Sequence, residues 1–176
     1  MKRGLMMSVA MLAALVLGSG VALAATIVGT NQADTRNGTA DRDYMYGLNG
    51  NDTLNGRGGN DEIHGDAGRD SLVGGGGNDQ ISGGSGNDGI AGGASAISGQ
   101  NELYGGSGAD TITADIPAAY DEVYAGSGDD TVFANDDRDD YIDCGRFYSP
   151  DSGTPDIDTA YVDAFDEVVE CENVIF

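Results

Sequence analysis

The chain has 176 residues but few basic ones and a single histidine. Eight Lys and Arg side chains stand against thirty Asp and Glu, which gives a formal net charge of −22. Such a charge repels nucleic acid and anionic membranes, so we expect neither as a partner. It also makes a compact fold costly unless cations join it. Composition therefore leaves two interpretations, an acidic disordered chain or a protein that folds around bound metal.

Long hydrophobic runs are missing too, except at the start of the chain. Two basic residues precede an apolar run over residues 5–17, and Ala22-Leu23-Ala24 fits the small-x-small rule for signal cleavage. We therefore expect residues 1–24 to be a signal peptide cleaved after Ala24, followed by a secreted mature chain. That mature chain would keep six basic and all thirty acidic residues, a net charge of −24. The alternative is an uncleaved membrane anchor over residues 5–25.

Cysteine is also scarce, with Cys144 and Cys171 the only two. In an exported chain a pair of cysteines favours a disulfide. From the entropy of loop closure, this bridge would stabilise the folded state by roughly 3–4 kcal/mol. Two free thiols or an intermolecular bridge are the alternatives. A zinc site is not indicated, because no second Cys or His lies close in sequence to either cysteine.

Glycine, in contrast, is abundant and recurs with a period of nine residues. From Gly47 the chain reads GLNGNDTLN, GRGGNDEIH, GDAGRDSLV, GGGGNDQIS and GGSGNDGIA. Positions one and four are always glycine, position six is always aspartate and position eight is always aliphatic. Self-similarity at a fixed short period indicates a repeat architecture, and five uninterrupted copies argue against a flexible linker.

The copies become irregular toward both ends. GTNQADTRN has Arg36 at the aliphatic position and GTADRDYMY has Asp41 at the fourth, so residues 25–46 are predicted to be degenerate repeats that form an N-terminal cap. Downstream, a thirteen-residue copy has Asn101 at the Asp position, and copies of eleven and ten residues keep the Asp-x-aliphatic pattern as far as residue 142. We expect the repeat domain to span residues 47–142 and residues 143–176 to form a C-terminal cap pinned by the disulfide. Short strands are expected there around residues 160–162 and 168–169.

Each nonapeptide predicts a six-residue turn followed by a three-residue strand. Glycine at positions one and four permits positive φ, and asparagine at position five tolerates the left-handed region. In the strand, position eight points inward and positions seven and nine point outward. Two copies, eighteen residues, would then make one coil of an all-β, right-handed parallel β-roll with one inward aliphatic side chain per strand.

The aspartates indicate what holds such a thin core together. Copies two apart would stack about 4.8 Å apart, with Asp52, Asp70 and Asp88 in one column and Asp61 and Asp79 in the other. Unit charges at that spacing repel by roughly 3–4 kcal/mol at an effective dielectric near 20. A cation between the turns would turn this repulsion between aspartates into a net attraction. Carboxylate oxygens together with turn carbonyl oxygens suit Ca²⁺ better than Mg²⁺.

The repeat resembles the G-G-x-G-x-D-x-U-x signature of RTX, or haemolysin-type, calcium-binding proteins. GGGGNDQIS, GGSGNDGIA and GGSGADTIT fit it at every defined position. The resemblance covers residues 29–142 and implies a parallel β-roll that binds several calcium ions. The side-chain ligands would be Asp52, Asp61, Asp70, Asp79, Asp88 and Asp110, with Asp43 as an extension of one column. Carbonyls of the turn glycines would complete the shell, from Gly47, Gly56, Gly65, Gly74, Gly83 and Gly105.

Three features depart from that family. Many members use a C-terminal export signal, whereas this chain begins with an N-terminal one. Many also append the roll to a lipase, protease or pore-forming domain, and here little sequence remains for such a domain. The thirteen- and eleven-residue copies, finally, predict a shift of the register after Asp88.

The sequence thus predicts a secreted protein whose repeats bind several Ca²⁺ ions and fold as they bind. The alternative is an extracellular adhesin or matrix scaffold that calcium stiffens. Positions seven and nine vary from Thr and Asn to Glu, His and Val, so we expect no regular surface array, and no polymer or cell-surface partner can be named. Catalysis is not expected, because the only histidine, His64, occupies an outward position without an evident pocket.

Overall fold

The computed structural model describes residues 24–93, 99–114, 120–145 and 156–176. These residues form sixteen short strands and no helix, and therefore contain no helix that could span a membrane. The expected signal peptide over residues 1–24, and with it the alternative of a membrane anchor, falls almost wholly outside the described residues.

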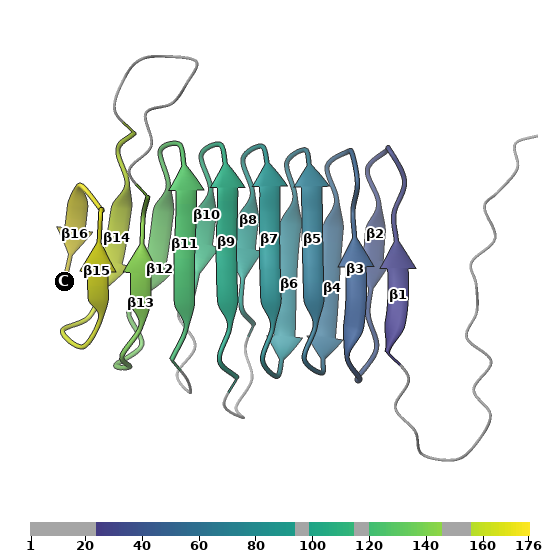
Figure 1. Cartoon of the computed structure of the whole chain (residues 1–176), viewed down its shortest axis with the longest axis horizontal. Coiled ribbons are helices and arrows are strands. Elements are labelled where there is room, and N and C mark those ends of the chain that lie inside the picture. Colours follow the sequence, from purple (N-terminus) through teal and green to yellow (C-terminus); the bar gives the residue numbers. More distant parts are fainter. Residues whose placement is uncertain (1–23, 94–98, 115–119, 146–155) are drawn as a thin grey trace, which may run out of the picture.

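The strands alternate between two parallel sheets of eight, one in front of the other in Figure 1. In chain order the first sheet contains β1 (Ala25–Val28), β3 (Asp43–Tyr46), β5 (Glu62–Ala67), β7 (Gln80–Ser85), β9 (Glu102–Ser107), β11 (Glu122–Ser127), β13 (Tyr141–Asp143) and β15 (Glu167–Val169). The second contains β2 (Thr35–Asn37), β4 (Thr53–Gly58), β6 (Ser71–Gly76), β8 (Gly89–Ala91), β10 (Thr111–Thr113), β12 (Thr131–Ala134), β14 (Thr159–Val162) and β16 (Asn173–Ile175). We call these the odd and the even sheet. Together they confirm the expected all-β parallel roll, a β-solenoid.

The strand register follows the eighteen-residue coil. Leu54 pairs with Leu72 and Ile63 with Ile81, each eighteen residues on. Across the thirteen-residue copy Ile81 pairs with Leu103 instead, so the extra residues lie between strands. The predicted register shift after Asp88 is therefore wrong: equivalent positions stay aligned to the end of both sheets.

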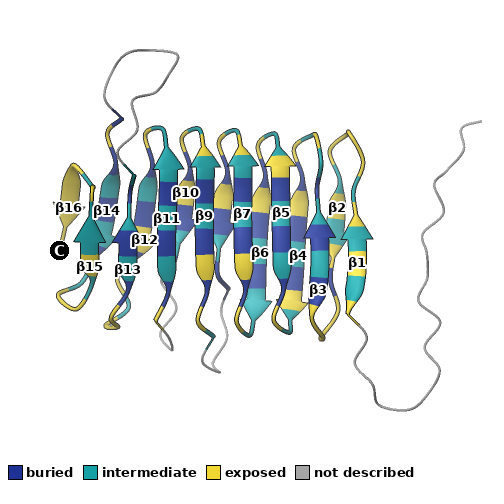
Figure 2. Cartoon of the chain, in the orientation of Figure 1, coloured by how far each residue is buried: buried dark blue, intermediate teal, exposed yellow. Residues whose placement is uncertain are grey.

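The core is one file of aliphatic side chains inside each sheet. Position eight is fully or almost fully buried in every regular copy. Strands β3 to β14 each contain buried residues, whereas β1, β2, β15 and β16, at the two ends of the solenoid, contain none (Figure 2). The core residues in this file are Met45, Leu54, Ile63, Leu72, Ile81, Ile90, Leu103, Ile112, Val123, Val132 and Ile142. The inward role predicted for position eight is confirmed.

The division of each copy into turn and strand differs from the expectation. Six strands are six residues long and run on from position seven through positions one to three, leaving turns of three residues. The longer strands arise because parallel ladder bonds continue where glycine has no side chain to prevent close approach; Gly75 N–H, for example, donates to the Gly92 carbonyl at 2.9 Å. These bonds pair main-chain groups that the turn would otherwise bury without partners.

Positive φ occurs at positions two and four, not at positions one and four as predicted. Position four is glycine in the left-handed region, as at Gly50 (φ 123°) and Gly86 (φ 126°). Position two is positive even where it is not glycine, as at Leu48 (79°) and Arg57 (76°). The asparagine expected to be left-handed instead accepts a hydrogen bond from the next coil: the Asn51 Oδ1 atom receives the Arg69 N–H at 3.1 Å.

The C-terminal segment extends the solenoid. Strands β14 and β15 lie where the sequence predicted them and pair in parallel with β12 and β13. Cys144 and Cys171 form the expected disulfide, with a Cα–Cα distance of 5.1 Å. Cys144 is fully buried beside the end of β13, and its N–H donates to Val169 at the end of β15. The bridge therefore joins two adjacent strands of the odd sheet.

Candidate metal centre

The aspartates at position six form two buried columns, one along each edge of the solenoid where the turns stack. Asp52 N–H donates to Asp70 Oδ1 at 2.7 Å, and Asp70 N–H donates to Asp88 Oδ1 at 2.8 Å. In the other column Asp61 N–H donates to Asp79 Oδ1 at 2.9 Å. The two columns predicted from the sequence are confirmed, and a ladder of charge-assisted hydrogen bonds links the turns in each.

The second carboxylate oxygen has a different environment. In nine of these side chains Oδ2 is buried and has no hydrogen-bond partner: Asp52, Asp61, Asp70, Asp79, Asp88, Asp110, Asp121, Asp130 and Asp140. These side chains are at most 3 % exposed. A buried carboxylate oxygen without a partner is costly, so the columns hold a row of acceptors that need positive charge or donors.

Glycine at position one gives this oxygen its space. A Cβ added to Gly47 would lie 2.5 Å from Asp52 Oδ2 and 2.7 Å from the carbonyl oxygen of Gly65 in the next coil. The same arrangement recurs at all six glycines that the sequence singled out, although φ is ordinary there. These glycines are therefore required by close approach, and each leaves a small space between a carboxylate oxygen and a main-chain carbonyl.

The carbonyls that face an unpartnered Oδ2 come from the next coil. They belong to Gly65, Gly74, Gly83, Gly92, Gly105 and Ala125, opposite Asp52, Asp61, Asp70, Asp79, Asp88 and Asp110 in that order. Gly92 and Ala125 were not predicted. The carbonyls of Gly47 and Gly56 instead face Asp34 and Asp43.

The donor set fits calcium. Among the described residues no three Asp, Glu, His or Cys side chains converge as a metal cluster, so a cation would take main-chain carbonyls into its shell. Neutral and anionic oxygens in a flexible arrangement are what Ca²⁺ accepts, whereas softer metals prefer nitrogen or sulfur. The residues present thus suit this ion, with one aspartate and one facing carbonyl at each position.

Burial changes the acidity of the columns. It raises the pKa of Asp61, Asp70 and Asp79 to about 6. It raises the pKa of Asp110, Asp121 and Asp140 to about 7 and that of Asp130 to about 8. Neighbouring carboxylates add to the effect, while the N–H donated by the preceding coil opposes it. Without a cation, these groups hold protons more tightly than a solvated carboxyl.

The columns extend beyond the predicted residues. Asp88 N–H donates to Asp110 Oδ1 at 2.7 Å, and Asp110 N–H donates to Asp130 Oδ1 at 2.8 Å. Asp121 and Asp140 continue the other column. The sequence signal for these residues was the Asp-x-aliphatic pattern, which persists through the longer copies.

Asn101 interrupts the row of carboxylates. It stands at position six, and its amide Oδ1 receives the Asp79 N–H at 3.0 Å. Asn101 N–H in turn donates to Asp121 Oδ1 at 2.7 Å. An amide thus maintains the turn-to-turn ladder without a charge.

The outward positions differ between the two sheets. On the odd sheet, position seven carries Tyr44, Glu62, Gln80, Glu102, Glu122 and Tyr141 in register. On the even sheet it carries Thr35, Thr53, Ser71, Gly89, Thr111, Thr131 and Thr159. The expectation of no regular surface array is therefore wrong for position seven, whereas position nine is mixed, as in His64, Ser82 and Tyr104 on the odd sheet. Consecutive copies alternate between sheets, so the sequence mixes two surfaces that the fold separates.

His64 lies on the odd face. Its ring stacks on Tyr46 with centroids 5.1 Å apart, and Nε2 lies 3.2 Å from Glu62 Oε1. These contacts make His64 part of a packed row of side chains on the surface of the odd sheet.

Comparison with protein families agrees with this geometry. The model of the RTX calcium-binding nonapeptide repeat matches residues 28–63, 37–72, 64–96, 97–116 and 119–142. The chain belongs to this family. No curated protein matches the sequence significantly. The RTX repeats and the solenoid together indicate calcium binding, and the matched range includes the longer copies after Asp88.

Proposed function

We propose that this RTX protein is exported, binds several Ca²⁺ ions between its stacked turns and folds as they bind. The observation that carries the proposal is the row of nine buried Oδ2 atoms, six of which lie beside a carbonyl of the next coil. A chain with 22 excess negative charges would press these carboxylates together only at a high electrostatic cost. Calcium offsets that cost because it is attracted to both turns at once.

Export supports the same function. Extracellular calcium is near millimolar, which suits the weak sites typical of extracellular modules. The N-terminal sequence has the features of a cleavable signal, and the disulfide fits an oxidising compartment. We assign the protein no catalytic activity.

Folding on binding is tested by circular dichroism of residues 25–176 in chelator and at millimolar Ca²⁺. We expect a largely disordered chain in chelator and a cooperative gain of β-structure with calcium. D70N should weaken binding, because it removes one buried charge while leaving an oxygen for the Asp52 N–H. D66N is the matched control, since Asp66 lies in the same nonapeptide copy, near the end of β5, but is exposed. A spectrum that is the same with and without calcium would overturn the proposal.

A calcium-stiffened adhesin or matrix scaffold is the second candidate. The observation in its favour is the ordered row on the odd face. Tyr104 and Tyr124 stack 5.1 Å apart, and their hydroxyls donate to Glu102 and Glu122 at 3.2 Å. Pelleting of the calcium-loaded protein with intact cells or extracellular polymer separates the two functions. Pelleting that E102Q/E122Q abolishes would favour the scaffold.

A further inference from the structure

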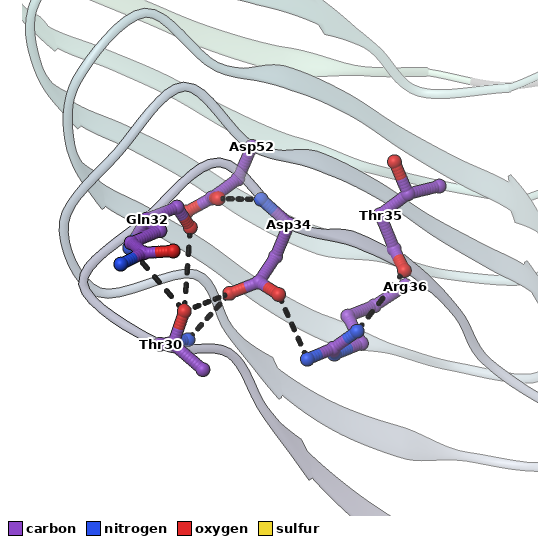
Figure 3. A network of polar contacts seen from close by, with 6 residues as sticks. All are labelled: Thr30, Gln32, Asp34, Thr35, Arg36 and Asp52. Atoms are coloured by element: carbon purple, nitrogen blue, oxygen red, sulfur yellow. Dashed lines mark hydrogen bonds and ion pairs between the residues drawn. The ribbon is translucent and has the colours of Figure 1, made fainter. Parts of the chain in front are cut away.

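The first turn of each column differs from the turns that follow. Asp34 begins one column and Asp43 the other, and both have donors on Oδ2. Thr30 donates its N–H at 2.5 Å and its hydroxyl at 2.8 Å to Asp34 Oδ2 (Figure 3). Thr39 donates its N–H at 2.6 Å and its hydroxyl at 3.1 Å to Asp43 Oδ2. In both turns the oxygen that is unpartnered farther along the solenoid has two hydrogen bonds.

The threonines also change the shape of the turn. Each hydroxyl accepts the N–H of the residue two further on, Gln32 at 3.3 Å and Asp41 at 3.1 Å, as side chains of this type do in local turns. Both threonines occupy position two, where Leu48, Arg57 and Asp66 have φ between 71° and 79°. Thr30 and Thr39 are not in that region. The solenoid therefore contains two kinds of turn.

The space beside the aspartate is retained in both kinds. A Cβ at Gly29 would meet the Gly47 carbonyl at 2.5 Å, and one at Gly38 would meet the Gly56 carbonyl at the same distance. The carbonyl that faces Oδ2 in the later turns thus faces it here as well. The difference is the pair of donor hydrogens that points at the oxygen.

We propose that Thr30 and Thr39 replace calcium in the first turn of each column, so that calcium binding begins at Asp52 and Asp61. This inference rests on the proposed function and specifies which turns bind calcium and which do not. Two donors on one carboxylate oxygen use the lone pairs that a cation would take, and their hydrogens repel a cation. At Asp34 a positive charge is also present, because Arg36 lies 2.8 Å from Oδ1 (Figure 3). In the folded protein the first turn of each column then needs no calcium, and Asp43, expected from the sequence to be a calcium ligand, is not one.

The test is the number of calcium ions bound per chain by the purified protein, measured by equilibrium dialysis at saturating Ca²⁺. D43N and D61N are the matched pair. Each replaces a position-six aspartate by the residue that already stands there as Asn101, so the ladder bond is kept. D61N should lose one ion and D43N none. Loss of an ion in D43N would overturn the threonine caps and leave calcium binding intact.

A second variant tests the same point in the opposite direction. T39D/D41G converts GTADRD into GDAGRD, which is this chain's own turn at residues 65–70, without a change of net charge. It should bind one additional ion. A folded T39D/D41G protein with an unchanged ion count would contradict the proposal. A wild-type protein that binds no calcium would overturn the proposed function and the caps together.

Discussion

At the scale of single residues, the repeat depends on glycine and aspartate acting as a pair. Position-one glycine is needed because the aspartate of its own copy and the carbonyl of the next coil approach the place of a Cβ. The aspartate uses one oxygen for the N–H of the preceding coil and leaves the other beside that glycine. Substitution at either residue therefore affects both the packing and the metal position.

Gly74→Ala tests this pairing. Its Cβ would meet the Gly92 carbonyl at 2.6 Å and also Asp79 Oδ2. We expect a loss of roughly 1–3 kcal/mol in the free energy of unfolding at saturating calcium from overpacking, together with weaker calcium binding. Gly89→Ala is the control, because its Cβ would have only one neighbour, the Asp70 carbonyl at 3.9 Å. Urea unfolding in calcium measures both, and equal effects of the two substitutions would contradict the close-approach argument.

At the scale of the element, each strand is stabilised chiefly by its neighbours in the same sheet. A single inward aliphatic residue per copy buries little surface, so ladder bonds, the aspartate columns and the disulfide supply the rest. The C-terminal strands pack with smaller or more exposed side chains: Ala160 lies in β14, and Val174 and Ile175 in β16 remain exposed. The disulfide joins strands in the part of the solenoid where the core is weakest.

The double substitution C144A/C171A should therefore lower the free energy of unfolding at saturating calcium by roughly 3–4 kcal/mol. This is the free-energy contribution of the entropy of closing a loop between residues separated by 27 positions. Chemical denaturation followed by circular dichroism measures it. Reduction of the wild-type protein should reproduce the effect, and ion binding at Asp52 and Asp61, far from the bridge in the sequence, should not change. An unchanged denaturation midpoint would show that the bridge adds no stability.

At the scale of the whole molecule, the excess negative charge links folding to both calcium and protons. Burial raises the pKa of Asp61, Asp70 and Asp79 to about 6, that of Asp110 to about 7 and that of Asp130 to about 8. A raised carboxyl pKa means that the folded chain binds protons more tightly than the unfolded one. This contribution to stability is fully present below the unfolded value near 3.8 and is lost as pH rises through the folded pKa values.

The metal-free protein should therefore contain more β-structure at pH 5 than at pH 8. Calcium affinity should change in the opposite direction, because the ligands must be ionised. For a ligand with a pKa of 6–7, affinity should rise on the order of tenfold between pH 5.5 and 7.5. Circular dichroism of the metal-stripped chain and calcium titration across that range measure the two trends. Parallel trends would contradict the assignment of the buried aspartates as ligands.

The fold and most of the candidate site could be predicted because the period of nine is a local property of the sequence. Asp52, Asp70 and Asp88 recur at the length of one coil, and Ile81 and Ile90 lie at inward positions, so stacking and burial follow from the spacing. The threonine caps had a signal that was not used: both GTNQAD and GTADRD carry threonine at position two and lack glycine at position four.

The period by itself determined the parallel solenoid, its core positions and the two aspartate columns, because a repeat that cannot bury its apolar face alone must stack on its neighbours. Other features depend on contacts between coils. Positive φ at Leu48, Arg57 and Asp66 follows from how one turn lies against the next, and three unlike residues give no common signal. The register after the longer copies is set by strand pairing, and the two surfaces are separated only when alternate copies enter different sheets. Only the tertiary structure decided these, because each depends on residues about eighteen positions apart meeting across a coil.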